Sequence, residues 1–370
     1  MMIVGIPAEI KKQEHRVGMI PLGVRQLVRR GVTVLVEKGA GVGADYLDEE
    51  FADAGAEMVP AAAEIFGRSD LIVKVKEPQP QEVAMLREGQ MLFTYLHLAA
   101  DKGLTQDLVA SGVTGIAYET VQVGHRLPLL EPMSEVAGRM SVMVGAYFLA
   151  KHEGGRGTLL GGVPGVLPGR VTIIGGGTSG VNAAKVATGI GAETTILELD
   201  SARMTWLDTA MPHARTLYSS EGALMELLPR TDLLIGAVLV PGAKAPKLVT
   251  RDMLRGMRQG TVLVDIAVDQ GGCVETTRPT THENPIFVEE GVIHYCVANM
   301  PGAYARTSTQ ALANVTLPYV QLLATAGLEG ACAQRPELVG GINCLGGKLT
   351  CPEVGGAHGM ETVLTGMELS

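Results

Sequence analysis

The sequence predicts an α/β fold with two doubly wound, Rossmann-like domains, whose mostly parallel sheets are joined by long helices. Strand and helix patterns alternate along the chain, which is typical of parallel sheets covered by helices. A chain of 370 residues is long enough for two domains of ordinary size. One strand–turn–helix–strand segment, at residues 171–200, also carries the glycine spacing of a nucleotide-binding unit.

In the first third of the chain, we predict strands that alternate with helices. Short apolar runs predict the strands, at residues 2–7, 32–37, 71–75, 91–96 and 115–118. Amphipathic patterns between them predict the helices, at residues 22–30, 49–54, 61–66, 83–87 and 103–111. No phosphate-type glycine turn follows any of these strands, so we expect this domain to supply substrate-binding groups.

The rest of the chain continues the same alternation. Residues 131–153 predict one long helix, of a length that suits a connector between domains. Beyond the nucleotide unit, further elements are predicted as strands at 215–218, 233–238, 261–265 and 294–297 and as an amphipathic helix at 308–324. Residues 238–249 predict a loop, and the glycine-rich tail from Leu328 predicts little regular structure.

The nucleotide unit begins with a buried strand at residues 171–174. Gly175, Gly177 and Gly180 follow at G-x-G-x-x-G spacing. The first permits a tight turn, the second lets the backbone approach a pyrophosphate, and the third lets the helix pack against the strand. The helix N-terminus then offers N–H groups to the phosphates. We therefore predict a dinucleotide site, although a purely structural turn is the alternative in a chain with 48 glycines.

An acidic residue, Glu198, ends the second strand of this unit. A carboxylate there accepts hydrogen bonds from the ribose hydroxyls and repels a 2′-phosphate, which favours NAD over NADP. Asp200 is the alternative ribose ligand. Arg203 either lies near the adenosine end of the cofactor or is an ordinary surface arginine.

Composition and charge exclude several classes of protein. The net charge of −9 argues against a nucleic-acid binder. Apolar runs are too short to predict a membrane span, and the N-terminus lacks the pattern of a signal peptide. The five cysteines include no C-x-x-C pair, so we expect reduced, buried thiols in a cytoplasmic protein. No residues have the spacing of metal ligands, and no metal is predicted.

Polar residues that follow predicted strands are the candidates for chemistry, because ligands of doubly wound folds bind beyond the carboxyl ends of strands. Arg16, Lys76 and His97 occupy such positions in the first domain, and Asp265 and Asp269 follow the 261–265 strand. A guanidinium binds a carboxylate, a lysine polarises a carbonyl, and a histidine or aspartate moves protons. The set predicts a small carboxylic acid with a carbonyl or amine as substrate.

Each candidate also has a structural alternative. Arg16 and Lys76 are alternatively exposed surface charges, His97 a core histidine, and Asp265 a turn cap. Asp269 is the stronger aspartate, because Gly271 and Gly272 follow it and allow the backbone to approach a ligand.

Several long blocks of the sequence closely resemble the bacterial alanine dehydrogenase family. They include GIPAEIKKQEHRV, VKVKEPQ, TYLHLA, AYETVQ, LPLLEPMSEVAGRM, GGVPGV, GAVLVPGAKAPKLV, VDIAVDQGGCVETTRPTTHENP and CVANMPG. The resemblance runs nearly end to end and weakens in the tail. It implies reversible oxidative deamination of L-alanine to pyruvate and ammonium with NAD.

The resemblance also implies the roles of particular residues. Arg16 and Lys76 would bind the substrate, and His97 and Asp269 would act as acid and base. The residues that would bind NAD, besides the glycines of the turn, are Ser134, Thr178, Ser179, Glu198, Arg203, Ser219, Val238, Leu239, Ile266, Ala267, Val268, Asp269, Arg278, Val297, Ala298, Asn299 and Met300. Many members have aspartate where this chain has Glu198.

The family's domain organisation is implied as well. It predicts a discontinuous substrate domain at residues 1–130 and 303–370 and an NAD-binding domain at residues 131–302. Members are commonly hexamers, so a homo-oligomer is expected.

Three alternatives remain at this point. The nearest is the NAD-binding component of proton-translocating transhydrogenase, which is similar in fold but lacks the counterparts of Lys76 and His97. A lysine-forming or opine-type dehydrogenase is the second. An NAD-sensing regulatory protein, which would bind NADH without turning over any amino acid, is the third.

Overall fold

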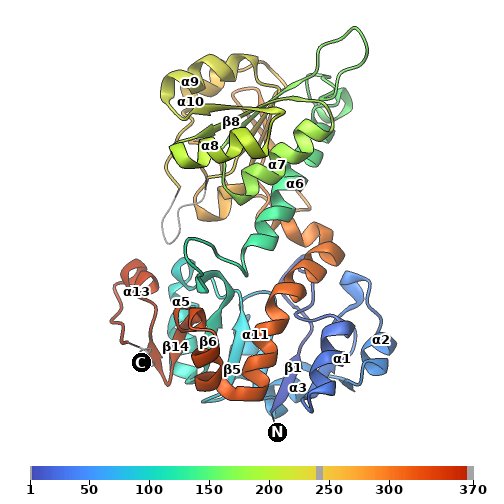
Figure 1. The fold of residues 1–370 in the computed structure, drawn as a ribbon, viewed down its shortest axis with the longest axis vertical. Coiled ribbons are helices and arrows are strands. Elements are labelled where there is room, and N and C mark those ends of the chain that lie inside the picture. The colour runs from blue at the N-terminus through green and yellow to red at the C-terminus, as the bar shows by residue number, and fades with distance from the viewer. Residues whose placement is uncertain (1, 239–244, 365–370) are drawn as a thin grey trace. The chain divides into compact units, whose positions relative to one another are not determined.

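The chain forms two compact units, Met1–Met133 with Tyr304–Ser370 (unit 1) and Ser134–Ala303 (unit 2). The computed structural model describes residues 2–238 and 245–364, without the side chains of Asp269 and Gln270. Each unit has its own sheet, shown with its helices in Figure 1.

Unit 1 is built on an eight-stranded sheet with the order β15-β14-β6-β5-β4-β1-β2-β3. Its strands are β1 (Ile3–Ile6), β2 (Thr33–Glu37), β3 (Glu57–Val59), β4 (Leu71–Val73), β5 (Met91–Thr94), β6 (Thr114–Ala117), β14 (Ile342–Leu345) and β15 (Lys348–Leu349). The strands β1 to β6 pair in parallel, and β14 pairs antiparallel with both β6 and β15.

Helices cover both faces of this sheet. They are α1 (Pro21–Arg29), α2 (Asp48–Asp53), α3 (Ala62–Arg68), α4 (Pro80–Val83), α5 (Lys102–Ser111), α11 (Ala305–Gln334), α12 (Glu337–Gly341) and α13 (Pro352–His358). Leu71 and Val73 pack into one core cluster while Ile72 packs into another. Strand side chains alternate between faces, so both faces of the sheet are buried, as in parallel α/β sheets.

The prediction for the tail was wrong. From Leu328 onward the chain completes α11, forms α12 and α13, and adds β14 and β15 to the sheet of unit 1, beside β6 (Figure 1). Gly346 and Gly347, both with positive φ, connect β14 to β15. A two-residue turn of this kind suits a tight hairpin. Strands this short carry too little alternation to be recognised in a glycine-rich sequence.

Two helices of unit 1 also differ from their predicted limits. Helix α4 lies ahead of the predicted 83–87 segment, because Pro80 opens it and Glu82 accepts a hydrogen bond from the Gln79 backbone N–H at 2.8 Å. Helix α11 extends far beyond residues 308–324, with non-helical backbone at Gly327.

Within the described residues, the segment Met300–Gln334 contains one helix that is long and apolar enough to cross a membrane. Leu312, Val320 and Leu323 of α11 are buried in the core of unit 1. We therefore assign the apolar face of α11 to this core, since a buried helix of a globular domain has the same composition.

Unit 2 is built on a seven-stranded sheet with the order β12-β13-β11-β10-β7-β8-β9. Its strands are β7 (Arg170–Ile174), β8 (Glu193–Glu198), β9 (Ala214–Tyr218), β10 (Leu233–Gly236), β11 (Val262–Asp265), β12 (Ile286–Glu289) and β13 (Val292–Tyr295). All neighbours pair in parallel except β12, which the sequence prediction missed and which pairs antiparallel with β13.

The strand order of unit 2 reverses between β7 and β10, as in a dinucleotide-binding fold. Its helices are α6 (Glu131–Phe148), which begins just before the unit boundary, α7 (Thr178–Gly189), α8 (Ser201–Ala210), α9 (Glu221–Leu227) and α10 (Arg251–Arg255). The long helix predicted at 131–153 ends at Phe148, and a short 3₁₀ turn follows at Lys151–Glu153. The predicted class, two Rossmann-like units with mostly parallel sheets, is confirmed.

Candidate active site

The glycine turn follows β7 at the point where the strand order of unit 2 reverses. Gly175 has a φ of 101°, and a Cβ on it would lie 2.8 Å from the Ala237 carbonyl oxygen. A Cβ on Gly180 would lie 1.8 Å from the Gly175 carbonyl oxygen. A Cβ on Gly177 would meet no described atom within 4 Å. The first and third glycines are therefore required by packing, and the second leaves open space.

That open space lies at the start of α7. Thr178 and Ser179 form the first turn of this helix, and its N-cap, Gly177, provides no side chain to cap it. Uncapped N–H groups and the positive end of the helix dipole together favour a bound anion. The turn fits the pyrophosphate of a dinucleotide.

The Glu198 carboxylate lies against this turn. Its Oε2 accepts a hydrogen bond from the Gly176 backbone N–H at 2.8 Å, and its Oε1 accepts one from Leu199 at 2.7 Å. Asp200 instead caps α8, since its Oδ1 accepts a hydrogen bond from the Arg203 backbone N–H at 2.6 Å. Of the two carboxylates, Glu198 lies where a ribose next to the pyrophosphate would be.

Arg203 also reaches the turn. Its Nε donates to the Gly176 carbonyl at 2.7 Å, and its guanidinium stacks 4.1 Å from the Trp206 ring centroid. It is therefore held beside the glycine turn by specific contacts, which distinguishes it from an ordinary surface arginine.

Most of the other residues expected to bind NAD follow the carboxyl ends of strands in unit 2. Ser219 follows β9, Val238 follows β10, Ile266, Ala267 and Val268 follow β11, and Val297, Ala298, Asn299 and Met300 follow β13. This edge is the ligand-binding edge of doubly wound sheets. Leu239 lies outside the described residues.

Two expected NAD residues lie elsewhere. Ser134 is in α6, which approaches α7 so closely that a Cβ on Gly138 would lie 2.2 Å from the Ser179 carbonyl oxygen. Arg278 stacks 3.9 Å from the Phe287 ring centroid, and its side chain is 63% exposed. Ser134 therefore lies about one helical turn before the point where α6 meets the start of α7, while Arg278 lies next to the β12 edge strand.

The two aspartates after β11 differ in their surroundings. Asp265 is fully buried and accepts hydrogen bonds from the backbone N–H groups of Ala267 at 3.1 Å and Cys273 at 3.0 Å. Burial raises the pKa of Asp265, while these hydrogen bonds oppose that shift. It is the turn cap that the sequence left as an alternative. The backbone of Asp269 lies in the following 3₁₀ turn, Ile266–Gln270, and its side chain is outside the described part.

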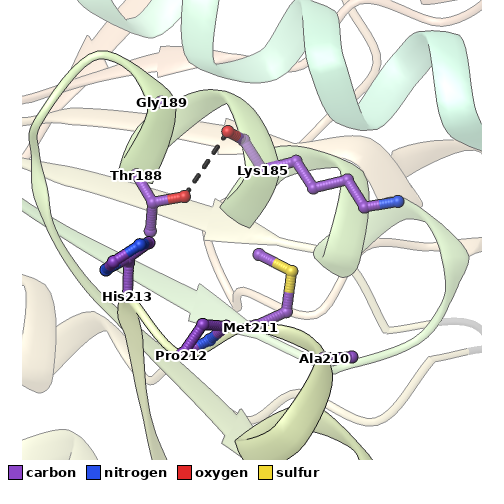
Figure 2. A pocket seen from close by; sticks show the side chains of 7 residues that line it. All are labelled: Lys185, Thr188, Gly189, Ala210, Met211, Pro212 and His213. Atoms are coloured by element: carbon purple, nitrogen blue, oxygen red, sulfur yellow. Dashed lines mark hydrogen bonds between the residues drawn. The ribbon is translucent and has the colours of Figure 1, made fainter.

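A cavity of about 260 Å³ lies at the other end of α7 (Figure 2). Its lining comes from the C-terminal ends of α7 and α8 and the segment before β9, with Lys185 and His213 as its charged or titratable side chains. The glycine turn lies at the N-terminal end of α7. This cavity is therefore separate from the dinucleotide edge of the sheet.

The substrate candidates lie in unit 1, and Arg16 is the most deeply buried of them. Its side chain is 2% exposed, and Glu14 accepts hydrogen bonds from its Nε and Nη2, each at 2.6 Å. Nη1 lies 2.9 Å from the Met133 sulfur. Burial acts to lower the pKa of Arg16, but the ion pair with Glu14 outweighs it and raises the pKa above its usual value. Arg16 is not a surface charge.

Lys76 is also buried, at 9% exposure. Thr94 Oγ1 donates to its carbonyl at 2.9 Å, and Glu9 Oε1 accepts from the preceding backbone N–H of Val75 at 2.6 Å. The backbone that carries Lys76 is therefore fixed from two sides.

A second lysine fixes the Glu9 carboxylate that holds this backbone. Lys74 is fully buried, with its Nζ 3.2 Å from Glu9 Oε2 and 2.5 Å from Glu82 Oε1. Burial acts to lower its pKa, but the two carboxylates outweigh burial and keep the lysine charged. Lys74 orders Glu9, which in turn holds the backbone at Val75.

His97 follows β5 in an unusual backbone conformation. Its φ of 50° and ψ of 32° lie in the left-handed region, and Glu119 Oε1 accepts its backbone N–H at 2.6 Å. Its Nδ1 lies 3.1 Å from Glu77 Oε2, and its side chain is 42% exposed. This exposure excludes the core histidine that was the alternative.

Contacts connect these residues within unit 1. Glu77 follows Lys76 in the chain and contacts the His97 ring, and the Tyr95 ring lies 5.8 Å from that ring. Burial raises the pKa of Tyr95 well above its usual value, while the nearby Arg16 charge opposes this. A guanidinium, an ammonium and an imidazole therefore occupy one region, where a small carboxylate with an amine or carbonyl can be bound and can exchange protons.

The sequence reading missed the carboxylates that hold these groups, which are Glu9, Glu14, Glu77 and Glu119. A usable signal existed for Glu14 and Glu77, since each lies within two residues of a predicted substrate residue in a segment that follows a predicted strand. No local pattern marks Glu119, whose partners Leu96 and His97 lie 23 and 22 residues away.

Comparisons with known proteins agree with this geometry. Residues 5–137 match the family described as alanine dehydrogenase/PNT, N-terminal domain, and residues 141–352 match its C-terminal domain. The chain is 54% identical over 364 residues to an alanine dehydrogenase of Halomonas elongata, covering 98% of each chain. It is 50% identical to a solved L-alanine dehydrogenase, with a TM-score of 0.93 and coverage of 96% of this chain and 99% of that one.

A solved transhydrogenase from Sinorhizobium meliloti is more distant. It is 24% identical, with a TM-score of 0.81 and coverage of 94% of this chain and 100% of that one, and this likeness shows the fold alone. The two matched domains span most of the chain and contain both the glycine turn and the cluster around His97. The chain belongs to the alanine dehydrogenase/PNT family.

Proposed function

We propose that this chain is an L-alanine dehydrogenase, which catalyses reversible, NAD-dependent oxidative deamination of L-alanine to pyruvate and ammonium. The observation that carries the proposal is the cluster of Arg16, Lys76 and His97 in unit 1. The NAD-binding component of a transhydrogenase needs no amino-acid site and would not require these groups. An NAD sensor would not require them either.

The cofactor is proposed to be NAD, bound at the carboxyl edge of the sheet in unit 2. The open space at Gly177 and the uncapped start of α7 suit the pyrophosphate. The Glu198 carboxylate suits the ribose hydroxyls and repels a 2′-phosphate, so NAD is favoured over NADP. When bound, the nicotinamide ring supplies the acceptor for the hydride that leaves the alanine Cα.

Arg16 is proposed to bind the alanine carboxylate. Glu14 fixes the plane of the guanidinium through two hydrogen bonds, and Nη1 faces the Met133 sulfur, which is a weak acceptor. A carboxylate is a far stronger acceptor than a thioether, so it would replace the sulfur at Nη1. Lys76 would hold the same carboxylate or polarise the carbonyl of pyruvate.

His97 and Asp269 are proposed to move the protons. Loss of hydride from Cα leaves an iminium, and water adds to its carbon while a base accepts a proton from that water. The nitrogen of the resulting carbinolamine takes up a proton, and its C–N bond then breaks to release ammonia while the hydroxyl proton is removed. His97 is suited to these transfers, because its ring is partly exposed and an imidazole exchanges protons near neutral pH.

The remaining assignments follow the same proposal. Unit 1 serves as the substrate domain and unit 2 as the NAD-binding domain. The protein acts in the cytoplasm, where its five buried, free cysteines stay reduced. It forms a homo-oligomer, a hexamer by family resemblance. Within the described residues, no group of three His, Cys, Asp or Glu side chains could hold a metal ion.

The test is NADH formation by the purified protein with L-alanine and NAD at alkaline pH. Glycine, L-serine and L-lysine serve as alternative substrates, and NADP as an alternative cofactor. We expect rapid turnover with alanine and NAD. Tight NADH binding without turnover of any amino acid would contradict the proposal and favour a transhydrogenase component or a sensor.

A further inference from the structure

The Glu77 carboxylate is shared between two basic side chains. Its Oε2 lies 3.1 Å from His97 Nδ1, and its Oε1 contacts Lys11 Nζ. The Glu77 side chain is only 13% exposed, whereas that of His97 is 42% exposed. The carboxylate is therefore fixed in the protein while the imidazole reaches toward solvent.

Glu77 remains ionised despite its burial. Burial acts to raise its pKa, but the hydrogen bond and charge of His97 and the nearby Lys76 and Lys11 outweigh it and hold the pKa well below its usual range. An ionised carboxylate can only accept hydrogen bonds. The nitrogen that faces it, Nδ1, must therefore carry the hydrogen.

The backbone of His97 is fixed by a second carboxylate. Glu119 accepts hydrogen bonds from the backbone N–H groups of Leu96 at 3.0 Å and His97 at 2.6 Å. These bonds hold His97 in its left-handed conformation, which a non-glycine residue adopts only at a cost. One carboxylate thus holds the backbone of His97, and another orients its ring.

We infer that Glu77 is a positioning residue, which keeps neutral His97 in the Nδ1–H tautomer so that Nε2 exchanges protons with the substrate. No described residue forms a hydrogen bond with Nε2. Lys11 anchors the opposite oxygen of Glu77 and so prevents the carboxylate from turning away. This inference rests on the proposed role of His97 in the reaction.

The groups around the His97 ring determine what a substitution of Glu77 would change. Glu77 is the carboxylate in contact with the ring, Glu119 binds the backbone, the Tyr95 ring packs beside it, and Lys76 and Lys11 lie beyond Glu77. Replacing Glu77 by glutamine removes the negative charge next to the ring and allows an amide NH₂ to face Nδ1. The tautomer of the ring would then no longer be fixed.

The first experiment compares Glu77→Gln with the wild type in alanine oxidation. We expect kcat to fall at least about 10-fold, because loss of a carboxylate that orients a histidine lets the ring adopt the wrong tautomer. KM for alanine should change less than about twofold, because the proposed substrate-binding residues Arg16 and Lys76 are unchanged. Glu77→Asp should recover part of kcat.

The matched control is Glu57→Gln, which removes an exposed carboxylate paired with Arg68 in the same unit.

A double variant separates action through His97 from a general structural role. In a His97→Asn background, Glu77→Gln should lower the residual rate no further. If the two losses multiply, or if Glu77→Gln alone retains kcat within twofold of an active wild type, the inference is wrong while the proposed function stands. An inactive wild type would instead overturn the proposed function.

A measurement on the unaltered protein completes the test, and it does not depend on the folding of any Glu77 variant. With ¹⁵N-labelled histidine, the His97 resonances at alkaline pH should show Nδ1 as the protonated nitrogen and Nε2 as the unprotonated one. The His97→Asn variant identifies these resonances. A predominant Nε2–H tautomer would overturn the inference whatever the kinetics of the variants.

Discussion

Glu14 and Arg16 form a buried ion pair with two hydrogen bonds of 2.6 Å, although a single residue separates them in the chain. Arg16 is 2% exposed and Glu14 is 6% exposed, so neither charge is stabilised by water. The pair therefore holds rigidly the guanidinium that is proposed to bind the substrate carboxylate. Each partner depends on the other for its stability in the core.

Glu14→Gln should lower the free energy of unfolding by about 3–5 kcal/mol, because it removes the carboxylate that forms an ion pair with a buried guanidinium. The measurement is urea denaturation. The control is again Glu57→Gln, whose exposed pair with Arg68 should leave the transition unchanged within error. An equal, small shift for both variants would show that the buried pair contributes little to stability.

His97→Ala should lower kcat by about 100-fold or more, the usual scale for a lost general acid or base. Binding of alanine should be affected less, since Arg16 and Lys76 remain. Steady-state kinetics with alanine and NAD measures both. His213→Ala, which alters an exposed histidine of unit 2, should retain wild-type rates. Near-normal turnover of His97→Ala would remove this residue from the reaction.

The fold could be predicted wherever the sequence pattern is local. The βαβ unit was recognised because strand, glycine turn, helix and acidic residue all occur within 30 residues, and β7 and β8 form as expected. Three edge strands were missed for the opposite reason. β3, β12 and β15 lie at the edges of their sheets, and their pairing partners, not their own patterns, determine that they are strands.

The same limit applies to the candidate site. Arg16, Lys76 and His97 could be proposed as candidates from the sequence, because each lies in a segment that follows a predicted strand, where ligands bind. The contact of Glu77 with His97, 20 residues apart, depends on β4 and β5 being neighbours in the sheet. The left-handed backbone of His97 could not be predicted either, because glycine is the residue expected in this conformation.

Glu198→Gln should weaken NADH binding about tenfold, which corresponds to about 1.4 kcal/mol, because a charged acceptor for the ribose is lost. The ratio of the affinities for NAD and NADP should also decrease, because the negative charge that repels the 2′-phosphate of NADP is removed. Asp200→Asn is the matched control, because Asp200 caps α8. It should leave the cofactor preference unchanged. If Asp200→Asn alters that preference and Glu198→Gln does not, the ribose ligand is Asp200.

An exposed apolar segment of unit 2 is the surface that we expect the proposed homo-oligomer to use. Leu159, Val163, Val166 and Leu167 are all more than half exposed, with Leu167 at 83%. Leu167→Glu should therefore shift the protein toward smaller species in size-exclusion chromatography with light scattering. Met225→Glu, on the exposed face of α9, is the control and should leave the assembly intact. An unchanged mass for Leu167→Glu would place the interface elsewhere.

Alanine substitutions at two glycines of the turn should separate folding from cofactor binding. Gly180→Ala places a Cβ 1.8 Å from the Gly175 carbonyl oxygen, so it should destabilise the protein by about 2–3 kcal/mol, as overpacking does.

In Gly177→Ala, the new Cβ meets no described atom within 4 Å, and the φ of −69° at this position suits alanine. The thermal stability of this variant should therefore match the wild type. Its new methyl group would occupy the space proposed for the pyrophosphate, and Kd for NADH should rise at least about tenfold. Thermal unfolding with and without NADH measures both effects. A Gly177→Ala variant that is stable and still binds NADH like the wild type would show that the pyrophosphate does not approach this turn.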